Sequence, residues 1–180
     1  MPTSLDGEEL KLTEIIVKLN RLAGSHGVGV LDHMEDRSVG IKSHEVYECP
    51  AATVLIEAHR ELEKLVLTRS EAAFKPIVEQ QWAWLVYSGL WIDPLLGDLQ
   101  SFIDSTQEFV TGETRIKLFK GSCRVAGRSS PFALYQKQLS TYGIDSTFDQ
   151  RAAEGFIKLW GLPSVMAARR SLLKAKEVLA

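Results

Sequence analysis

Apolar residues recur at every third or fourth position along four stretches of this chain, a spacing that is typical of amphipathic helices. The predicted helices cover residues 13–23, 51–67, 70–88 and 94–109. Thr13 is predicted to cap the first helix and Gly24 to end it, because glycine readily adopts a left-handed backbone conformation. Pro50 suits the first turn of the second helix, and Gly89 is predicted to end the third.

Alternation of apolar and polar residues predicts β-structure on both sides of these helices. It is clearest over residues 114–120 and 122–128, which we expect to form a hairpin with Lys120-Gly121 as its turn. Residues 2–10 are predicted to be extended, with a turn at Asp6-Gly7. Strands before and after a block of helices predict an α+β fold, with helices packed on a mixed or antiparallel sheet.

A less regular pair of strands is predicted between the first two helices. Residues 28–35 and 38–42 are assigned to it, and the chain is expected to reverse at Glu35-Asp36-Arg37. Residues 43–50 are predicted to form a loop, because Pro50 disfavours a helical conformation in the residue before it.

The C-terminal part of the chain predicts two helices. The first covers about residues 149–160 and is expected to end at Gly161 and Pro163. The second covers residues 164–180, where the apolar stripe is narrower than in a core-facing helix and indicates assembly with another helix. We therefore expect a domain over residues 1–163 and a C-terminal oligomerisation helix over residues 164–180. The stripe consists of Val165, Ala168, Leu172, Ala175 and Leu179.

Composition and charge narrow the classes of function. With 45% hydrophobic and 24% charged residues, the 180 residues are typical of a soluble globular protein. The net charge of −2 favours neither nucleic acid nor an anionic membrane as partner, and no apolar run approaches the ~20 residues of a membrane span. The acidic start is unlike a secretory signal, and Cys49 and Cys123 are too few for a disulfide framework. We expect a cytoplasmic location.

The spacing of the residue types that usually form metal sites or catalytic triads indicates neither kind of site in this sequence. The histidines are separated by seven, eleven and fifteen residues, which is unlike the spacing of zinc ligands. Lys120-Gly121-Ser122 lacks the rest of a phosphate loop and is interpreted as a hairpin turn. Lys117, Arg124 and Arg128 are interpreted as a solvated basic face of the same hairpin. The histidines are His26, His33, His44 and His59.

Six blocks of sequence point to a known family. The run from His26 to His59 reads HGVGVLDHMEDRSVGIKSHEVYECPAATVLIEAH. The others are AHRELEKLVLTR (58–69), WAWLVYSGLW (82–91), FIDSTQEFVTG (102–112), KLFKGSCRVAGRSSPFALY (117–135) and AEGFIKLWGLP (153–163). In this order they resemble the synthetase domain of the argininosuccinate synthase family, whose signature reads HGxGRIDxVENRxVGxKSRxVYExP. The resemblance, over residues 2–163, implies an α+β synthetase domain and then a helix that packs on neighbouring subunits of a tetramer.

The resemblance also implies a substrate site. In the family, the glutamate of VEN and the tyrosine of VYE help to hold citrulline, and the matching residues here are Glu35 and Tyr47. A carboxylate pairs with an amino-acid ammonium or accepts ureido N–H bonds, and a phenol adds an oriented hydrogen bond. Spacing alone favours a solvated turn glutamate at Glu35 and a half-buried tyrosine at Tyr47. The matched family blocks instead favour contact with a ligand.

The sequence departs from the family pattern around this pair. Val30 and His44 stand where the family has arginine, and Ser25 stands where arginine or lysine is common. Asp36 replaces an asparagine. We therefore expect three basic groups to be lost near a site that handles aspartate, ATP and pyrophosphate, all of which are anionic. Two explanations fit this loss of positive charge. One is relaxed selection on a non-catalytic remnant of the enzyme, and the other is a partner that supplies the positive charge.

The resemblance implies a ligase of arginine biosynthesis. ATP adenylates the ureido oxygen of citrulline, and the amine of aspartate then displaces AMP to give argininosuccinate. The family's SGGxD phosphate loop does not occur in these residues, so we expect ATP to be bound elsewhere, with no catalytic, cofactor-binding or metal-binding residue in this chain alone.

Two hypotheses follow. The first is the C-terminal part of an argininosuccinate synthase, inactive by itself and completed by a nucleotide-binding domain or a separate ATP-binding chain. The second is a non-catalytic remnant or regulatory module, which binds a small amino acid or co-assembles with a full-length synthase.

Overall fold

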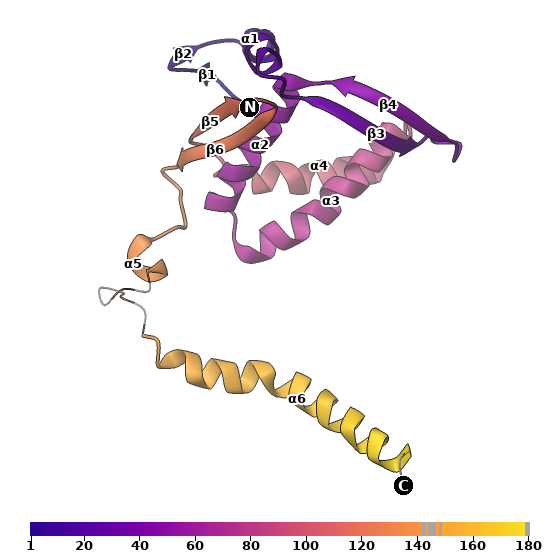
Figure 1. Ribbon diagram of the computed structural model, residues 1–180, viewed down its shortest axis with the longest axis vertical. Coiled ribbons are helices and arrows are strands. Elements are labelled where there is room, and N and C mark those ends of the chain that lie inside the picture. Colours follow the sequence, from indigo (N-terminus) through magenta and orange to yellow (C-terminus); the bar gives the residue numbers. More distant parts are fainter. Residues whose placement is uncertain (142, 144–146, 148, 179–180) are drawn as a thin grey trace. The chain divides into compact units, whose positions relative to one another are not determined.

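The computed structural model describes residues 1–180 except 142, 144–146, 148 and 179–180, and side chains from residue 175 onward lie outside this description. The described chain holds six helices and three antiparallel β-hairpins, so the predicted α+β fold is confirmed (Figure 1). It divides into two compact units, residues 1–135 and 136–180. The elements are β1 (Ser4–Leu5), β2 (Glu8–Glu9), α1 (Leu12–Ser25), β3 (Val30–Asp36), β4 (Lys42–Glu48), α2 (Pro50–Val66), α3 (Arg69–Tyr87), α4 (Pro94–Thr106), β5 (Glu113–Phe119), β6 (Ser122–Ser129), α5 (Lys137–Ser140) and α6 (Ala152–Val178).

The core of the first unit lies where α1, α2 and the β5–β6 hairpin meet. Ile15, Leu19 and Ala23 recur at intervals of four residues, so they form one buried face of α1. Ala51 and Val54 of α2 complete the buried cluster with Val28. Partly buried side chains from the hairpin pack against this cluster, namely Ile116, Leu118 and Cys123.

The β5–β6 hairpin forms as predicted. Its turn residues Lys120 and Gly121 have φ angles of +44° and +80°, the pair of positive values that a type I′ turn requires. Arg128 departs from the predicted basic face, because its guanidinium lies 2.6 Å from the carboxylate of Glu61, a buried residue of α2. This ion pair fastens the hairpin to the helix.

Helices α3 and α4 pack against each other beside α2 (Figure 1). The indole N–H of Trp82 donates to the Gln100 side chain over 2.9 Å, and the rings of Phe74 and Phe102 meet edge to face. Gly89 follows the end of α3 with a φ of +74°, as predicted. The Tyr87 hydroxyl, at the end of α3, donates to the Asp36 carbonyl over 3.4 Å and so links α3 to the second hairpin, β3–β4.

Both predicted ends of α1 were wrong. The N-cap is Lys11, whose backbone N–H donates to the Glu14 carboxylate over 2.9 Å, so Thr13 lies inside the helix. The helix continues through Gly24, and Gly27 takes the left-handed conformation instead, with a φ of +72°. The Glu14 carboxylate in the first turn thus satisfies the N-cap N–H in place of the expected hydroxyl cap.

The second unit contains α5 and one long helix, α6. The predicted break at Gly161 and Pro163 was wrong, because α6 continues through both residues. Proline removes one backbone hydrogen bond and costs about 3 kcal/mol within a helix, but the residues after Ser164 are mostly strong helix formers. Leu179, the last position of the predicted stripe, lies outside the described residues. Across the described chain, no helix is long and apolar enough to cross a membrane.

Candidate functional site

The β3–β4 hairpin carries both residues predicted to contact substrate, and its boundaries differ from the prediction. Strand β3 continues to Asp36, through the expected turn, and β4 occupies the expected loop, from Lys42 to Glu48. Glu35 and Tyr47 therefore both lie on strands, where the backbone fixes the direction of their side chains.

The chain reverses over residues 37–41 instead. The backbone N–H of Arg37 donates to the Ile41 carbonyl over 2.9 Å, and that of Gly40 donates to the Arg37 carbonyl over 2.7 Å. Gly40 has a φ of +80°. This glycine is the signal that sequence reasoning missed, because short hairpin loops commonly place glycine at a position with positive φ.

The strand register places Glu35 and Tyr47 on the same face. Glu35 pairs with Ser43, and Tyr47 pairs with Leu31. Because side chains alternate between the two faces of a strand, every second residue from these positions points the same way. The shared face, called here the Glu35 face, consists of Leu31, His33, Glu35, Ser43, Glu45 and Tyr47.

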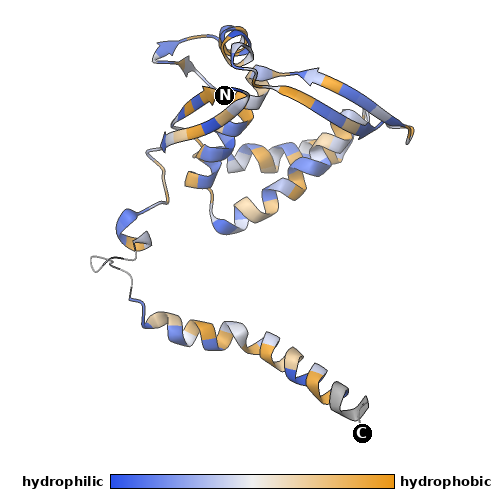
Figure 2. Ribbon diagram, viewed as in Figure 1, coloured by the Kyte–Doolittle hydropathy of each residue, from blue (hydrophilic) through white to orange (hydrophobic). Residues whose placement is uncertain are grey.

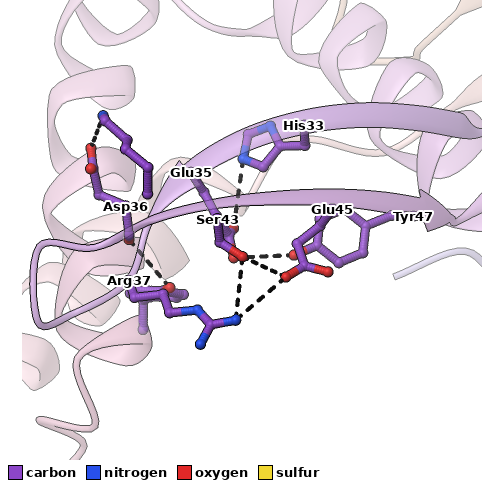
Figure 3. Close-up of polar contacts among 9 residues, drawn as sticks. His33, Glu35, Asp36, Arg37, Ser43, Glu45 and Tyr47 are labelled. Atoms are coloured by element: carbon purple, nitrogen blue, oxygen red, sulfur yellow. Dashed lines mark hydrogen bonds and ion pairs between the residues drawn. The ribbon is translucent and has the colours of Figure 1, made fainter.

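Glu35 and Tyr47 are in direct contact on this face. The Tyr47 hydroxyl donates to Oε1 of Glu35 over 3.2 Å, and the Nε2 atom of His33 lies 3.7 Å from Oε2 of the same carboxylate (Figure 3). Partial burial and the neighbouring Glu35 carboxylate raise the pKa of the Tyr47 phenol, so it remains a donor at neutral pH. The structure thus brings together the two residues that the sequence singled out.

A second set of contacts lies beside this pair. Ser43, which is almost fully buried, donates its hydroxyl to Oε1 of Glu45 over 2.5 Å. The Arg37 guanidinium points back from the turn, 3.4 Å from the Ser43 hydroxyl and 3.8 Å from Glu45 (Figure 3). Sequence reasoning assigned no role to these three residues. The Glu35 face thus offers carboxylate acceptors beside hydroxyl and guanidinium donors, a set suited to a small polar molecule with N–H groups.

The positions where basic residues of the family pattern are missing do not lie on the Glu35 face, whereas His33, another unusual residue, does lie on it. Val30 and His44 lie on the opposite face of the hairpin, where His44 pairs with Asp32 over 3.0 Å. Asp36 is also on that face and pairs with Lys42 over 2.7 Å. Ser25 is the last residue of α1. Val30, His44 and Asp36 therefore make no contact with the Glu35–Tyr47 pair on this face, whereas the unusual His33 lies 3.7 Å from Glu35.

A separate polar cluster joins α2, α3 and the end of α4. Lys75, only 3% exposed, lies 2.8 Å from Glu63 and also bonds Glu79. His59 and Gln107 contact the same Glu63 carboxylate over 3.1 and 2.9 Å. Burial alone would raise the pKa of Glu63, but hydrogen bonds from His59, Lys75 and Gln107 lower it to about 2. The i, i+4 pairs His59–Glu63 and Lys75–Glu79 were visible in the sequence, but their meeting across two helices was not.

This cluster borders a shallow hollow of about 390 Å³. None of its lining residues belongs to β3 or β4, so it is separate from the Glu35 face. The carboxylates in its wall are already paired with cations, which suits a structural role. The lining residues are Pro2, Leu55, Ile56, His59, Arg60, Glu63 and Glu79. Across the described residues, no group of three or more His, Cys, Asp or Glu side chains is arranged to hold a metal ion.

Comparison with known proteins gives one consistent result. The family model described as "Arginosuccinate synthase C-terminal domain" matches residues 1–167. A protein named argininosuccinate synthase from Rubrobacter xylanophilus is 60% identical over 164 residues, which cover 91% of this chain and 40% of the relative. Relatives of the same name from Pyrococcus furiosus and Limosilactobacillus reuteri are 56% and 52% identical, over 93% and 99% of this chain. The chain spans about two fifths of the length of these relatives.

Proposed function

The chain belongs to the argininosuccinate synthase C-terminal domain family, and on this premise we propose that its Glu35 face forms the citrulline side of an argininosuccinate synthase site. The observation that carries the proposal is the contact between Glu35 and Tyr47, the two positions that match the family's substrate residues. In the complete reaction, citrulline and aspartate condense at the expense of ATP, giving argininosuccinate, AMP and pyrophosphate.

The residues of this chain have a binding and orienting role in that reaction. The Glu35 carboxylate accepts N–H bonds from citrulline or pairs with its ammonium, and the Tyr47 hydroxyl supplies an oriented donor. Contacts to ATP and to most of aspartate are assigned to protein outside these 180 residues, either a further domain or a separate ATP-binding chain. We assign no catalytic residue, cofactor-binding residue or metal ligand here, and we expect the protein to work in the cytoplasm.

A citrulline titration by calorimetry tests the proposal. We expect saturable heat from the unaltered chain, and Glu35→Gln should weaken the affinity by about ten- to a hundredfold, because a hydrogen bond to a charged group contributes about 1.5–3 kcal/mol. Glu48→Gln is the matched control, since Glu48 lies on the opposite face of the same hairpin and loses the same charge. An affinity that Glu35→Gln leaves unaltered would remove Glu35 from the site.

A second candidate function, assembly, is favoured by α6. Apolar side chains along this helix are exposed, and the rings of Phe156 and Trp160 stack with centroids 5.4 Å apart. We propose that α6, including the predicted oligomerisation helix from residue 164 onward, joins copies of the chain, as in a tetramer. This surface equally suits a non-catalytic module that co-assembles with a full-length synthase. Absence of citrulline heat would favour that second function.

Light scattering tests the assembly proposal. A chain that ends at residue 151 lacks α6 and is expected to show a smaller oligomer than the full chain, with unchanged circular dichroism per residue in the remaining elements. Substituting Trp160 and Leu159 by serine within the full chain is the companion variant, because it keeps the length. An oligomer of unchanged size in both variants would refute this role of α6.

A further inference from the structure

The two carboxylates that flank Tyr47 differ in how their charge is balanced. Glu45 accepts the Ser43 hydroxyl and lies 3.8 Å from the Arg37 guanidinium. Glu35 accepts a neutral phenol and has His33 at 3.7 Å, and within the described chain no lysine or arginine lies within 4 Å of it. Glu35 is therefore the acid that remains for a ligand, while Glu45 is held by the protein.

We propose that Arg37 sets the charge selectivity of this site, favouring an amino acid with an uncharged side-chain end over a cationic one of the same size. The proposal rests on the amino-acid-binding function proposed above. Arg37 acts through Glu45 as a positioning residue and is not assigned a contact to the ligand. The two glutamates and Arg37 together carry one net negative charge, and without the guanidinium they would carry two.

The size of the effect follows from Coulomb's law. A second uncompensated carboxylate attracts a ligand of charge +1 more strongly and leaves a ligand of zero net charge almost unaffected. The Arg37 and Glu45 side chains are 61% and 40% exposed, so solvent screens the interaction strongly. We therefore expect a selectivity change on the order of three- to tenfold at low ionic strength.

The charges on the opposite face of the hairpin provide a matched control. Lys42 is paired with Asp36 over 2.7 Å, and it lies within five residues of Arg37 along the chain. Lys42→Gln removes the same single positive charge from the same hairpin without releasing Glu45. It separates the specific role of Arg37 from a general change in net charge.

Citrulline and arginine are suitable probes, because citrulline has a ureido oxygen where arginine has a guanidinium nitrogen and they are otherwise alike. We would measure both dissociation constants by calorimetry for the unaltered chain, Arg37→Gln, Arg37→Lys and Lys42→Gln. Arg37→Gln is expected to shift the ratio of affinities toward arginine three- to tenfold. Arg37→Lys should restore most of the original ratio because it keeps the charge, and Lys42→Gln should change the ratio less than twofold.

The outcomes separate this proposal from the function on which it rests. If the unaltered chain binds citrulline but Arg37→Gln leaves the ratio unchanged, the selectivity role of Arg37 is wrong and the binding function stands. An equal loss of affinity for both ligands would show a merely structural effect and would also refute the proposal. If the unaltered chain binds neither ligand, both proposals fail.

Discussion

Glu35 on the β3–β4 hairpin and Glu63 on α2 show two ways in which this molecule holds a carboxylate. Glu63 is bonded by Lys75, His59 and Gln107, which come from three helical segments, and its pKa falls to about 2. Glu35 is bonded only within its own hairpin, by a neutral phenol and a nearby imidazole. The fold balances the charge of Glu63 but not that of Glu35.

This difference separates scaffold from site. A buried ion cluster is costly to break, because removing one partner leaves the other charge buried and unpaired. It therefore holds α2, α3 and α4 in one arrangement. Most side chains of the β3–β4 hairpin are exposed, and polar and apolar residues are mixed along both of its strands (Figure 2). Its polar groups remain available to a ligand.

Two lysines test the contrast most strongly. Lys75→Met is expected to lower the free energy of unfolding by about 3–5 kcal/mol, because it leaves Glu63 and Glu79 without their buried cation. Lys42→Met on the hairpin removes an exposed partner of Asp36, and exposed pairs contribute less than about 1 kcal/mol. Urea denaturation followed by circular dichroism measures both.

A double variant sharpens this result. Replacing Glu63 by leucine together with Lys75→Met removes both buried charges, so it should be more stable than Lys75→Met alone. Equal destabilisation by Lys75→Met and Lys42→Met would show that the Glu63–Lys75 cluster contributes no more to stability than the exposed Asp36–Lys42 pair, which would contradict the contrast between the two regions.

Acid pH gives a smaller, graded effect on the same cluster. The pKa of Glu63 in the fold is about 2, below its ordinary 4.5. A depressed carboxyl pKa stabilises the fold above the unfolded-state pKa, and this contribution is lost as pH falls from about 4.5 to 2. Its size is on the order of 3 kcal/mol, since the pKa of Glu63 falls from 4.5 to about 2 and one pKa unit corresponds to about 1.36 kcal/mol.

The pH effect is isolated by comparing the unaltered chain with Glu63→Gln. The difference in their unfolding free energies should shrink between pH 6 and pH 2, because the variant has no carboxyl to protonate at this position. A constant difference between the unaltered chain and Glu63→Gln across this pH range would contradict the assigned pKa.

The strength of a local pattern decided how well the fold could be predicted. The three middle helices were predicted within three residues at each end, because apolar spacing, Pro50 and Gly89 act within a few residues. Strand β4 was missed, since its residues KSHEVYE are half exposed and alternate weakly. Its pairing with β3 depends on partners six to eighteen residues away, most of which a short local window does not contain.

The candidate site was predicted in part for a related reason. Glu35 and Tyr47 were singled out by resemblance, but their contact depends on strand register, which Gly40 and the turn at residues 37–41 determine. His44 and Val30 were expected near the pair, and the same register places them on the opposite face. A shift of one residue in the register would place Tyr47 on the opposite face from Glu35 and put His44 on the face of Glu35 instead.

By itself, the sequence determined the three middle helices, the β5–β6 hairpin and the family to which the chain belongs, since each of these depends on residues close together or on matched blocks. Only the tertiary structure decided which charges meet. Lys75 reaches Glu63, Arg128 reaches Glu61, and Arg37 reaches Glu45. Among the described residues, the only basic group near Glu35 is the imidazole of His33, and no lysine or arginine lies within 4 Å of it. Coulomb energy depends on distance and on burial, and folding sets both for residues that lie far apart in the chain.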